Sequence, residues 1–400
     1  SMGPVKKLGA TGEEAFSGRW VEGNRIEILH DGRQCFPVML RLIEAAKTEI
    51  CLEMYWFGSD RTGRRFADAL MARAREGVLV RVIYDAVGSW DTDGGLFDDL
   101  RRAGCEVLEF NPIAPWRRGP KAMEISRRDH RKILVVDGRV GMTGGVNLGD
   151  PWAPEEEGGA GWRDDMMLVE GPAAKDLRDV FFHTWTRKES WDHSLGEGGA
   201  AVEDAVSFGT IGEDPEALDA PVLVLANHYR GERRAIRGNY LRAIRHASRS
   251  IEITNSYFVP DSRIRRELMD AVRRGVRVRV MVPGQSDVPA VQRASQYLYG
   301  RMLRAGIRIF EWNRSVLHAK TAIVDDAWCT VGTYNLDYLS WRSNLEVTMG
   351  VRDADVCRAM RTRFDRDLES CREILASEWS KRPLLPRVAE RFWFTFRKVL

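Results

Sequence analysis

The chain has 400 residues and is 44% hydrophobic, enough for two domains or one large duplicated unit with a buried core. Its 61 Lys and Arg residues barely outnumber its 58 Asp and Glu residues, and a formal net charge of +3 does not by itself indicate nucleic-acid binding. The absence of an apolar run of about 18 residues excludes a predicted membrane span or secretory signal, and six scattered cysteines without a CxxC exclude a predicted zinc site or disulfide framework.

In chain order, predicted helices alternate with predicted strands. Residues 64–75 form a pattern with one charged and one apolar face, which is typical of a surface helix, and the valine-rich run 78–84 predicts a strand. The alternation returns later with a helix pattern at 263–274 and a strand pattern at 276–282. This order predicts an α/β fold with a largely parallel or mixed sheet.

The sequence also repeats itself. Three stretches align without gaps, namely 43–60 with 244–261, 77–85 with 275–283, and 102–111 with 304–313. A stretch rich in glycine and acidic residues at 189–221 predicts the connection between the repeats. We therefore predict two similar halves, residues 1–200 and 201–380, each a mixed β-sheet flanked by helices, packed with pseudo-two-fold symmetry around one active site. Residues 381–400 would form a basic, amphipathic tail.

Each half contains the same short motif, "HRKILVVD" at 130–137 and "HAKTAIVD" at 318–325. In a strand, alternation puts the His and the Lys on one face and the final Asp on the other. Asp137 and Asp325 are therefore predicted to be structural, pairing with a base or capping a turn. An Asn follows 15 residues after each motif Lys.

Across a pseudo-dyad, the two motifs would bring pairs of His, Lys and Asn into one pocket. Lys and Asn donors suit an anion with several oxygens, such as a phosphoryl group. Two histidines suit in-line displacement, one as nucleophile and one as acid and base. This chemistry needs no metal or other cofactor. The predicted catalytic and substrate-binding residues are His130, His318, Lys132, Lys320, Asn147 and Asn335.

A nucleophilic imidazole also needs an acceptor on its second nitrogen. Each half offers a carboxylate beyond its motif, Asp164 in "GWRDDMML" and Glu346 in "SNLEVTMG", and Asp165 competes with Asp164. The halves differ in one loop, because Asn111 lies 19 positions before His130 while Asn313 lies 5 before His318. The extra segment, 112–129, is predicted to be a basic, partly apolar loop in which Trp116 binds substrate.

The duplicated motif resembles the signature of the phospholipase D superfamily, and the chain most resembles bacterial cardiolipin synthases of the short type without N-terminal transmembrane helices. Similar stretches occur at 24–32, 84–89, 162–173 and 335–346, and in "GGVN" after the first motif. The resemblance covers about residues 24–375.

This resemblance implies a phosphohistidine intermediate and transfer of a phosphatidyl group from phosphatidylglycerol to a hydroxyl of a second phospholipid. His130 would carry the phosphatidyl group and His318 would act as acid and base, although near-symmetry allows the reverse. The family further implies a peripheral position on the cytoplasmic side of the bacterial inner membrane. Trp116 would then guard a lipid entrance.

The C-terminal residues 384–400 form an amphipathic pattern. Val388, Phe392, Phe396 and Val399 share a stripe, Ala389, Trp393 and Leu400 lie beside it, and Arg387, Arg391 and Lys398 face away. Aromatic residues with flanking arginines suit an anionic bilayer interface, while the alternative is a helix docked on the protein's own core. Phe394, on the polar side, departs from the pattern.

Three other functions use the same groups: a hydrolytic phospholipase D, a nuclease or other phosphodiesterase, and a lipid-binding module with a relic site. A nuclease would need a basic groove with interleaved aromatics. The balanced charge and the apolar tail argue against it, and intact His and Lys in both halves argue against a relic.

Overall fold

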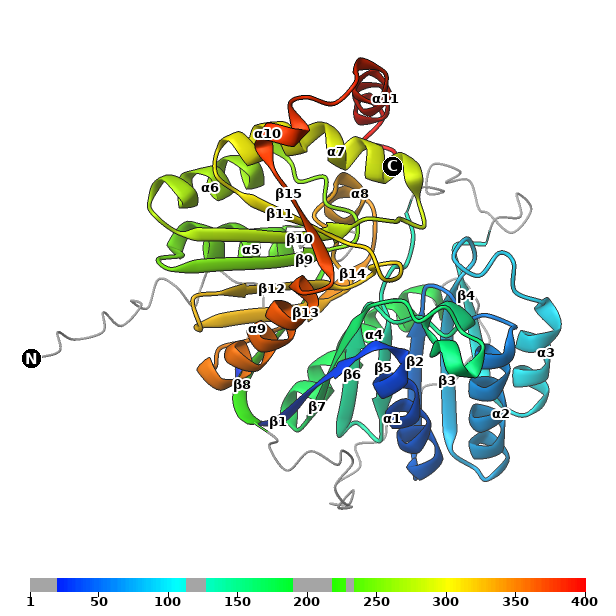
Figure 1. Ribbon diagram of the computed structural model, residues 1–400. Coiled ribbons are helices and arrows are strands. Elements are labelled where there is room, and N and C mark those ends of the chain that lie inside the picture. The colour runs from blue at the N-terminus through cyan, green and yellow to red at the C-terminus, as the bar shows by residue number, and fades with distance from the viewer. Residues whose placement is uncertain (1–19, 113–126, 190–217, 228–233) are drawn as a thin grey trace, which may run out of the picture.

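The computed structural model describes residues 20–112, 127–189, 218–227 and 234–400, which form two α/β halves side by side (Figure 1). The first half contains β1 (Val21–His30), α1 (Asp31–Ala45), β2 (Glu49–Met54), α2 (Arg61–Arg75), β3 (Leu79–Asp85), α3 (Gly94–Arg102), β4 (Glu106–Phe110), β5 (Ile133–Val136), β6 (Val140–Gly144), β7 (Asp165–Glu170) and α4 (Pro172–Glu189).

The second half repeats this order and then continues into the tail. It contains β8 (Leu218–Asn227), α5 (Ala235–His246), β9 (Ser250–Asn255), α6 (Ser262–Arg273), β10 (Arg277–Pro283), α7 (Pro289–Arg304), β11 (Arg308–Trp312), β12 (Lys320–Val324), β13 (Trp328–Gly332), α8 (Tyr338–Arg342), β14 (Glu346–Val351), α9 (Ala354–Leu368), β15 (Cys371–Ile374), α10 (Ala376–Trp379) and α11 (Leu384–Thr395).

The strands form one hydrogen-bonded sheet, and from its centre outward the equivalent strands of the two halves follow in the same order on each side. On one side the order is β1-β7-β6-β5-β2-β3-β4, and on the other it is β8-β14-β13-β12-β9-β10-β11, with β15 added at the edge. β1 and β8 pair antiparallel at the centre. Within each half, three strands joined by helices run parallel and the motif strand pairs antiparallel with the first of them. The predicted α/β fold of two similar halves is confirmed.

The duplicated helices begin in the same way because both halves keep the same capping residue. The Asp60 carboxylate accepts a hydrogen bond from the Gly63 N–H at the start of α2, and the Asp261 carboxylate accepts from Arg263 and Ile264 at the start of α6. These helices and the following strands β3 and β10 lie within a few residues of their predicted positions.

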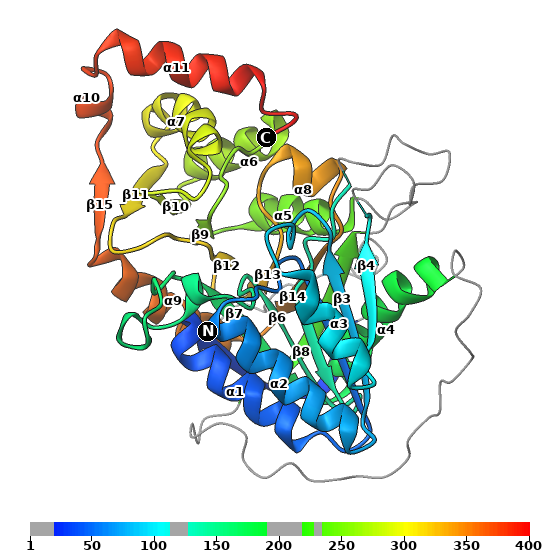
Figure 2. The same cartoon turned by 90° about the vertical axis from the view of Figure 1, so that its right-hand side faces the viewer.

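Three apolar clusters form the core, and one of them joins the two halves. One lies between the first half's sheet and α1–α3, and another between the second half's sheet and α5–α7. The third is shared, since it joins Phe181 of α4 and Phe364 of α9 with Ile133 of β5 and Val331 of β13. Figures 1 and 2 show α4 and α9 on the side of the sheets away from those outer helices. The two halves therefore form one unit with a common core.

The final aspartates of the two motifs occupy turns, as predicted. Asp137 and Asp325 have φ values of 52° and 57°, and each carboxylate accepts backbone N–H groups of the turn before β2 or β9. Typical contacts are Thr48 N to Asp137 Oδ1 at 2.8 Å and Arg249 N to Asp325 Oδ1 at 2.7 Å. They cap turns and point away from the motif histidines.

Two predicted segments fall outside the described residues: most of the connection 189–221, with the boundary at 200/201, and most of loop 112–129, with Trp116. The six cysteines are free thiols and five of them are buried. Within the described ranges, no helix has the length and apolar character needed to cross a bilayer.

We expect Asp137→Ala and Asp325→Ala each to lower the free energy of unfolding by about 1–3 kcal/mol, because each leaves several turn N–H groups without their acceptor. Urea unfolding followed by circular dichroism measures the loss, with Asp68→Ala on exposed α2 as the matched control. Stability equal to the control would show that these carboxylates do not hold the turns.

Candidate active site

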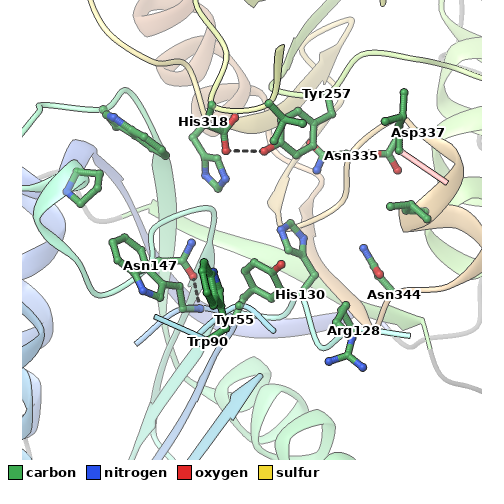
Figure 3. Close-up of a pocket in the computed structure, with 18 of the residues that line it drawn as sticks. Tyr55, Trp90, Arg128, His130, Asn147, Tyr257, His318, Asn335, Asp337 and Asn344 are labelled. Atoms are coloured by element: carbon green, nitrogen blue, oxygen red, sulfur yellow. Dashed lines mark hydrogen bonds between the residues drawn. The ribbon is translucent and has the colours of Figure 1, made fainter. Parts of the chain in front are cut away.

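The two motif histidines sit at the junction of the halves, just before strands β5 and β12. Their backbones are fixed by the opposite half, since His130 N donates to Leu345 O at 3.0 Å and His318 N donates to Arg163 O at 2.8 Å. Both side chains are nearly buried and face one cavity of about 640 Å³ (Figure 3). The sequence prediction that both histidines share a pocket agrees with this geometry.

Each histidine is held by the carboxylate of the other half. His130 Nδ1 donates to Glu346 Oε2 at 3.1 Å, and His318 Nδ1 donates to Asp164 Oδ2 at 2.8 Å. This crossing follows from the backbone contacts, because Leu345 and Arg163 immediately precede the two carboxylates. An ionised carboxylate can only accept, so each Nδ1 carries the proton and each Nε2 lone pair is left for the cavity.

Both carboxylates are buried and remain ionised. Burial acts to raise the pKa of the Asp164 carboxyl, but His318, Lys320 and the Trp152 indole lower it below its ordinary value. Burial likewise opposes ionisation of Glu346, but His130, the Thr333 hydroxyl and Lys132 lower its pKa. The Ser340 hydroxyl donates to the second Glu346 oxygen at 2.8 Å. Asp165, the competitor for the Asp164 position, instead binds His30 and Arg163.

The two lysines lie behind the histidines and not on the cavity wall. Lys132 Nζ donates to His130 O at 2.7 Å, and Lys320 Nζ lies 3.0 Å from His318 Nδ1. Burial and repulsion from Lys320 lower the pKa of Lys132 to about 7, and burial lowers that of Lys320 to about 8. Two cations close to one cavity, with little water to screen them, create a strong field for an anion.

Burial and the adjacent lysine also keep the imidazoles uncharged. Burial and Lys132 lower the pKa of His130 to about 4, and burial and Lys320 lower that of His318. Both histidines are therefore neutral at pH 7 before an anion enters. A bound phosphodiester would offset the lysine charges and raise the pKa of the histidine that must donate a proton.

Both predicted asparagines reach the cavity wall with their amide oxygens already occupied. Asn147 Oδ1 accepts from Trp56 N at 3.1 Å, and Asn335 Oδ1 accepts from Ser256 Oγ at 2.8 Å. Each NH₂ group is thereby left to donate toward the cavity (Figure 3). Together with the histidines, they provide donors and a nucleophile around a site for phosphoryl oxygens.

Sequence reasoning missed the aromatic wall of the cavity. Tyr55 and Trp152 pack edge-on against the rings of His130 and His318, with centroids 5.1 and 5.2 Å apart. Other aromatic lining residues are Trp56, Trp90, Trp162 and Tyr257. The signal was available in part, because Tyr55 and Tyr257 lie within the repeated stretches 43–60 and 244–261, just after the predicted strands.

The wall also carries three carboxylates, Asp91 from the first half and Asp287 and Asp337 from the second. Trp56 Nε1 donates to Asp91 Oδ1 at 3.2 Å, and Tyr257 Oη donates to Asp287 Oδ2 at 2.6 Å. Both carboxylates line the cavity, together with Asp337, whose pKa burial raises to about 7. Asp287 acts to raise the pKa of His318 and of Lys320, and Asp337 acts on Lys320 in the same direction, so these two carboxylates place negative charge near the second motif.

Two similar halves that each contribute one histidine to a single cavity are typical of enzymes that act on phosphodiesters. The family described as "Cardiolipin synthase, PLD-like domain" matches residues 39–185 and 240–368, so the chain belongs to this phospholipase D-like family. Cardiolipin synthase 1 of Bacillus cereus is 31% identical over 92% of this chain and 70% of its own length. The major cardiolipin synthase ClsA of Bacillus subtilis is 32% identical over 93% and 74%.

Solved structures show the same fold at lower identity. Phosphatidylserine synthase of Haemophilus influenzae superposes with a TM-score of 0.71 at 13% identity and covers 98% of both chains. Polyphosphate kinase of Porphyromonas gingivalis gives 0.54 at 14% identity and covers 86% of this chain and 50% of its own. The resemblance to phospholipase D-like cardiolipin synthases drawn from the motifs is confirmed.

We expect a bell-shaped pH profile of kcat/KM for a phospholipid substrate. It should fall below about pH 4, where His130 takes up a proton and ceases to be a nucleophile. It should fall again above about pH 7–8, where Lys132 and Lys320 lose their protons and the field for the anion weakens. Melting temperatures across the range separate titration from unfolding. An alkaline limb near the ordinary lysine pKa of about 10.4 would contradict the buried-cation arrangement.

We expect Glu346→Gln and Asp164→Asn each to lower kcat by about 10²–10⁴-fold, because each amide can present the wrong group to a histidine of the opposite half. Steady-state rates and melting temperatures are measured together. Asp165→Asn is the control, since this carboxylate binds His30 and Arg163 instead. Equal losses in folded Asp165→Asn and Asp164→Asn would refute the special position of Asp164.

Proposed function

We propose that this protein is a cardiolipin synthase-type enzyme that moves a phosphatidyl group from phosphatidylglycerol to a hydroxyl of a second phospholipid. Membership of the family supports a phospholipid phosphatidyltransferase. The observation that carries the mechanism is the pair of neutral imidazoles facing one cavity, each anchored through Nδ1 to a carboxylate of the opposite half.

In the first step, His130 Nε2 attacks the donor phosphorus and the phosphorus–oxygen bond to the glycerol headgroup breaks. His318, protonated once the anion is bound, gives its proton to the leaving glycerol oxygen. Asn147 and Asn335 donate to the phosphoryl oxygens, while the buried charges of Lys132 and Lys320 stabilise the crowded transition state. The product is glycerol and a phosphatidyl group bonded to His130.

In the second step, His318 takes the proton of the acceptor hydroxyl, whose oxygen attacks phosphorus. The phosphorus–nitrogen bond breaks and His130 becomes neutral again. The overall reaction exchanges one phosphate ester for another, so it needs neither an oxidant nor an energy source. Glu346 and Asp164 hold the rings and stabilise each imidazolium as it forms.

The cavity wall favours headgroups that carry hydroxyls. Asp91 and Asp287 line the cavity and can accept hydrogen bonds from glycerol hydroxyls. This arrangement supports a glycerol-type leaving group and a hydroxyl acceptor.

We place the enzyme peripherally on the cytoplasmic side of the bacterial inner membrane, with residues 1–200 and 201–380 acting as inseparable halves and residues 381–400 as a tail. Phospholipid substrates require access to a bilayer, and six free cysteines are consistent with a reducing compartment. The exchanged carboxylates support treating the halves as one catalytic unit.

We expect purified protein to convert phosphatidylglycerol vesicles to cardiolipin and glycerol. His130→Ala and His318→Ala should each lower turnover at least about 10³-fold, and His246→Ala on exposed α5 serves as the matched control. Quenching in neutral denaturing detergent, which spares the acid-labile phosphorus–nitrogen bond, should trap phosphatidyl label on wild type and on His318→Ala, but not on His130→Ala. Label on His130→Ala alone would reverse the two histidine roles.

The products separate the competing functions. Phosphatidic acid without cardiolipin would replace the transferase by a hydrolytic phospholipase D. Cleavage of single-stranded DNA with no turnover of lipid would refute both lipid reactions.

A further inference from the structure

The large apolar side chains exposed in the described part of the chain are concentrated at the C-terminus. The six large apolar side chains exposed between residues 384 and 400 have exposed fractions from 45% for Phe396 to 84% for Leu385. We call this set the docking face; it consists of Leu384, Leu385, Val388, Phe392, Phe396 and Val399. Isolated exposed apolar residues are ordinary, but six on one helix and its extension form a patch that marks an interaction surface.

The docking face cannot turn inward, because the opposite side of α11 is already packed on α7. The Phe394 and Tyr297 rings stack with centroids 4.6 Å apart, and Trp393 packs against the second half's core. Glu390 is only 2% exposed and pairs with Arg382. Phe394, which departs from the amphipathic pattern in the sequence, therefore belongs to the intramolecular contact. The alternative of a helix docked on the protein's own core is therefore observed for one side of α11, which runs along α7 (Figures 1 and 2).

Positive charge surrounds the docking face. Arg387, Arg391 and Lys398 are exposed on the same segment. Cations gathered around an apolar stripe complement a surface that is apolar inside and anionic at its face, as a phosphatidylglycerol bilayer is.

The same segment ends at the catalytic cavity. Leu400 lines the cavity with His130 and His318, and Lys398 Nζ lies 5.9 Å from the Tyr338 ring on α8. Trp90 and Val288, two further exposed apolar residues, also line the cavity. The docking face and the cavity mouth are thus joined through the C-terminal residues.

We propose that the docking face inserts into the interface of an anionic bilayer and holds the cavity mouth at the level of the lipid headgroups. This inference rests on the proposed function, since it assigns the surface from which that function draws its substrates. The lipid headgroup enters the cavity while its acyl chains stay in or near the bilayer.

The test uses the full chain with Val388→Ser, Phe392→Ser and Val399→Ser combined, and Leu375→Ser as the control for loss of an exposed leucine outside α11. Co-sedimentation with phosphatidylglycerol vesicles should fall at least about 10-fold for the triple variant and stay unchanged for the control. Turnover of phosphatidylglycerol in vesicles should fall in parallel. Turnover of a short-chain, monomeric phosphatidylglycerol should stay within about twofold of wild type.

The vesicle-binding measurement tests the docking face, and the turnover measurement tests the proposed function, so either hypothesis can be refuted without the other. Wild type that binds vesicles through the docking face but turns over neither lipid would refute the proposed function alone. A folded triple variant that binds vesicles like wild type would overturn the docking face, as would equal loss of turnover on monomeric lipid. A dimer that the triple variant dissociates, with vesicle binding unchanged, would assign the face to a second copy instead. If the triple variant melts early, Phe392→Ser alone is compared in the same binding assay.

Discussion

The structure depends on an exchange of carboxylates between its halves. Glu346 of the second half fixes the imidazole of the first, and Asp164 of the first half fixes the imidazole of the second. The exchange is set by the backbone, because the residue before each carboxylate hydrogen-bonds to a motif histidine across the interface. Neither half alone could orient its own histidine in this way. The shared apolar core between the halves therefore serves catalysis as much as stability, since any shift at the interface moves an imidazole relative to its acceptor.

The two halves match closely where they face the cavity and differ behind it. His, Lys and Asn recur in both, but Asp129 and Arg131 beside the first motif correspond to Leu317 and Ala319 beside the second. Burial raises the pKa of Asp129, and the Arg131 guanidinium reaches Thr184 and Asn227 O, so the first half carries a buried polar network under His130. The second half has apolar side chains at the matching positions. This difference in environment gives two chemically identical imidazoles distinct surroundings, which a reaction with one nucleophile and one acid requires.

The periodicity of the sequence was sufficient to predict the helices and strands and the two similar halves, because both depend on local sequence patterns. Spacing also indicated that His130 and His318 share a pocket and that Asp137 and Asp325 cap turns. It could not reveal that the carboxylates cross between halves, since that depends on contacts between residues 154 and 216 positions apart in a jointly formed interface. Nor could it show that the lysines lie behind the histidines, because alternation assigns a face of a strand and not the depth of a long side chain. For Phe394, a helical pattern identified the odd residue but not the α7 surface that receives it.

Burial of the site bears directly on whether the phosphatidyl group goes to an alcohol or to water. A phosphohistidine reacts with whichever hydroxyl reaches phosphorus in line, so transfer requires that the acceptor displace solvent from the cavity. Tyr55, Trp152 and the other aromatic rings give the wall apolar surface, and Asp91 and Asp287 offer acceptors that a glycerol hydroxyl can satisfy. A cavity mouth held at the bilayer interface would add to this selection by meeting lipid headgroups at high local concentration. In this arrangement the low dielectric that lowers the lysine and histidine pKa values is the same condition that favours transfer over hydrolysis.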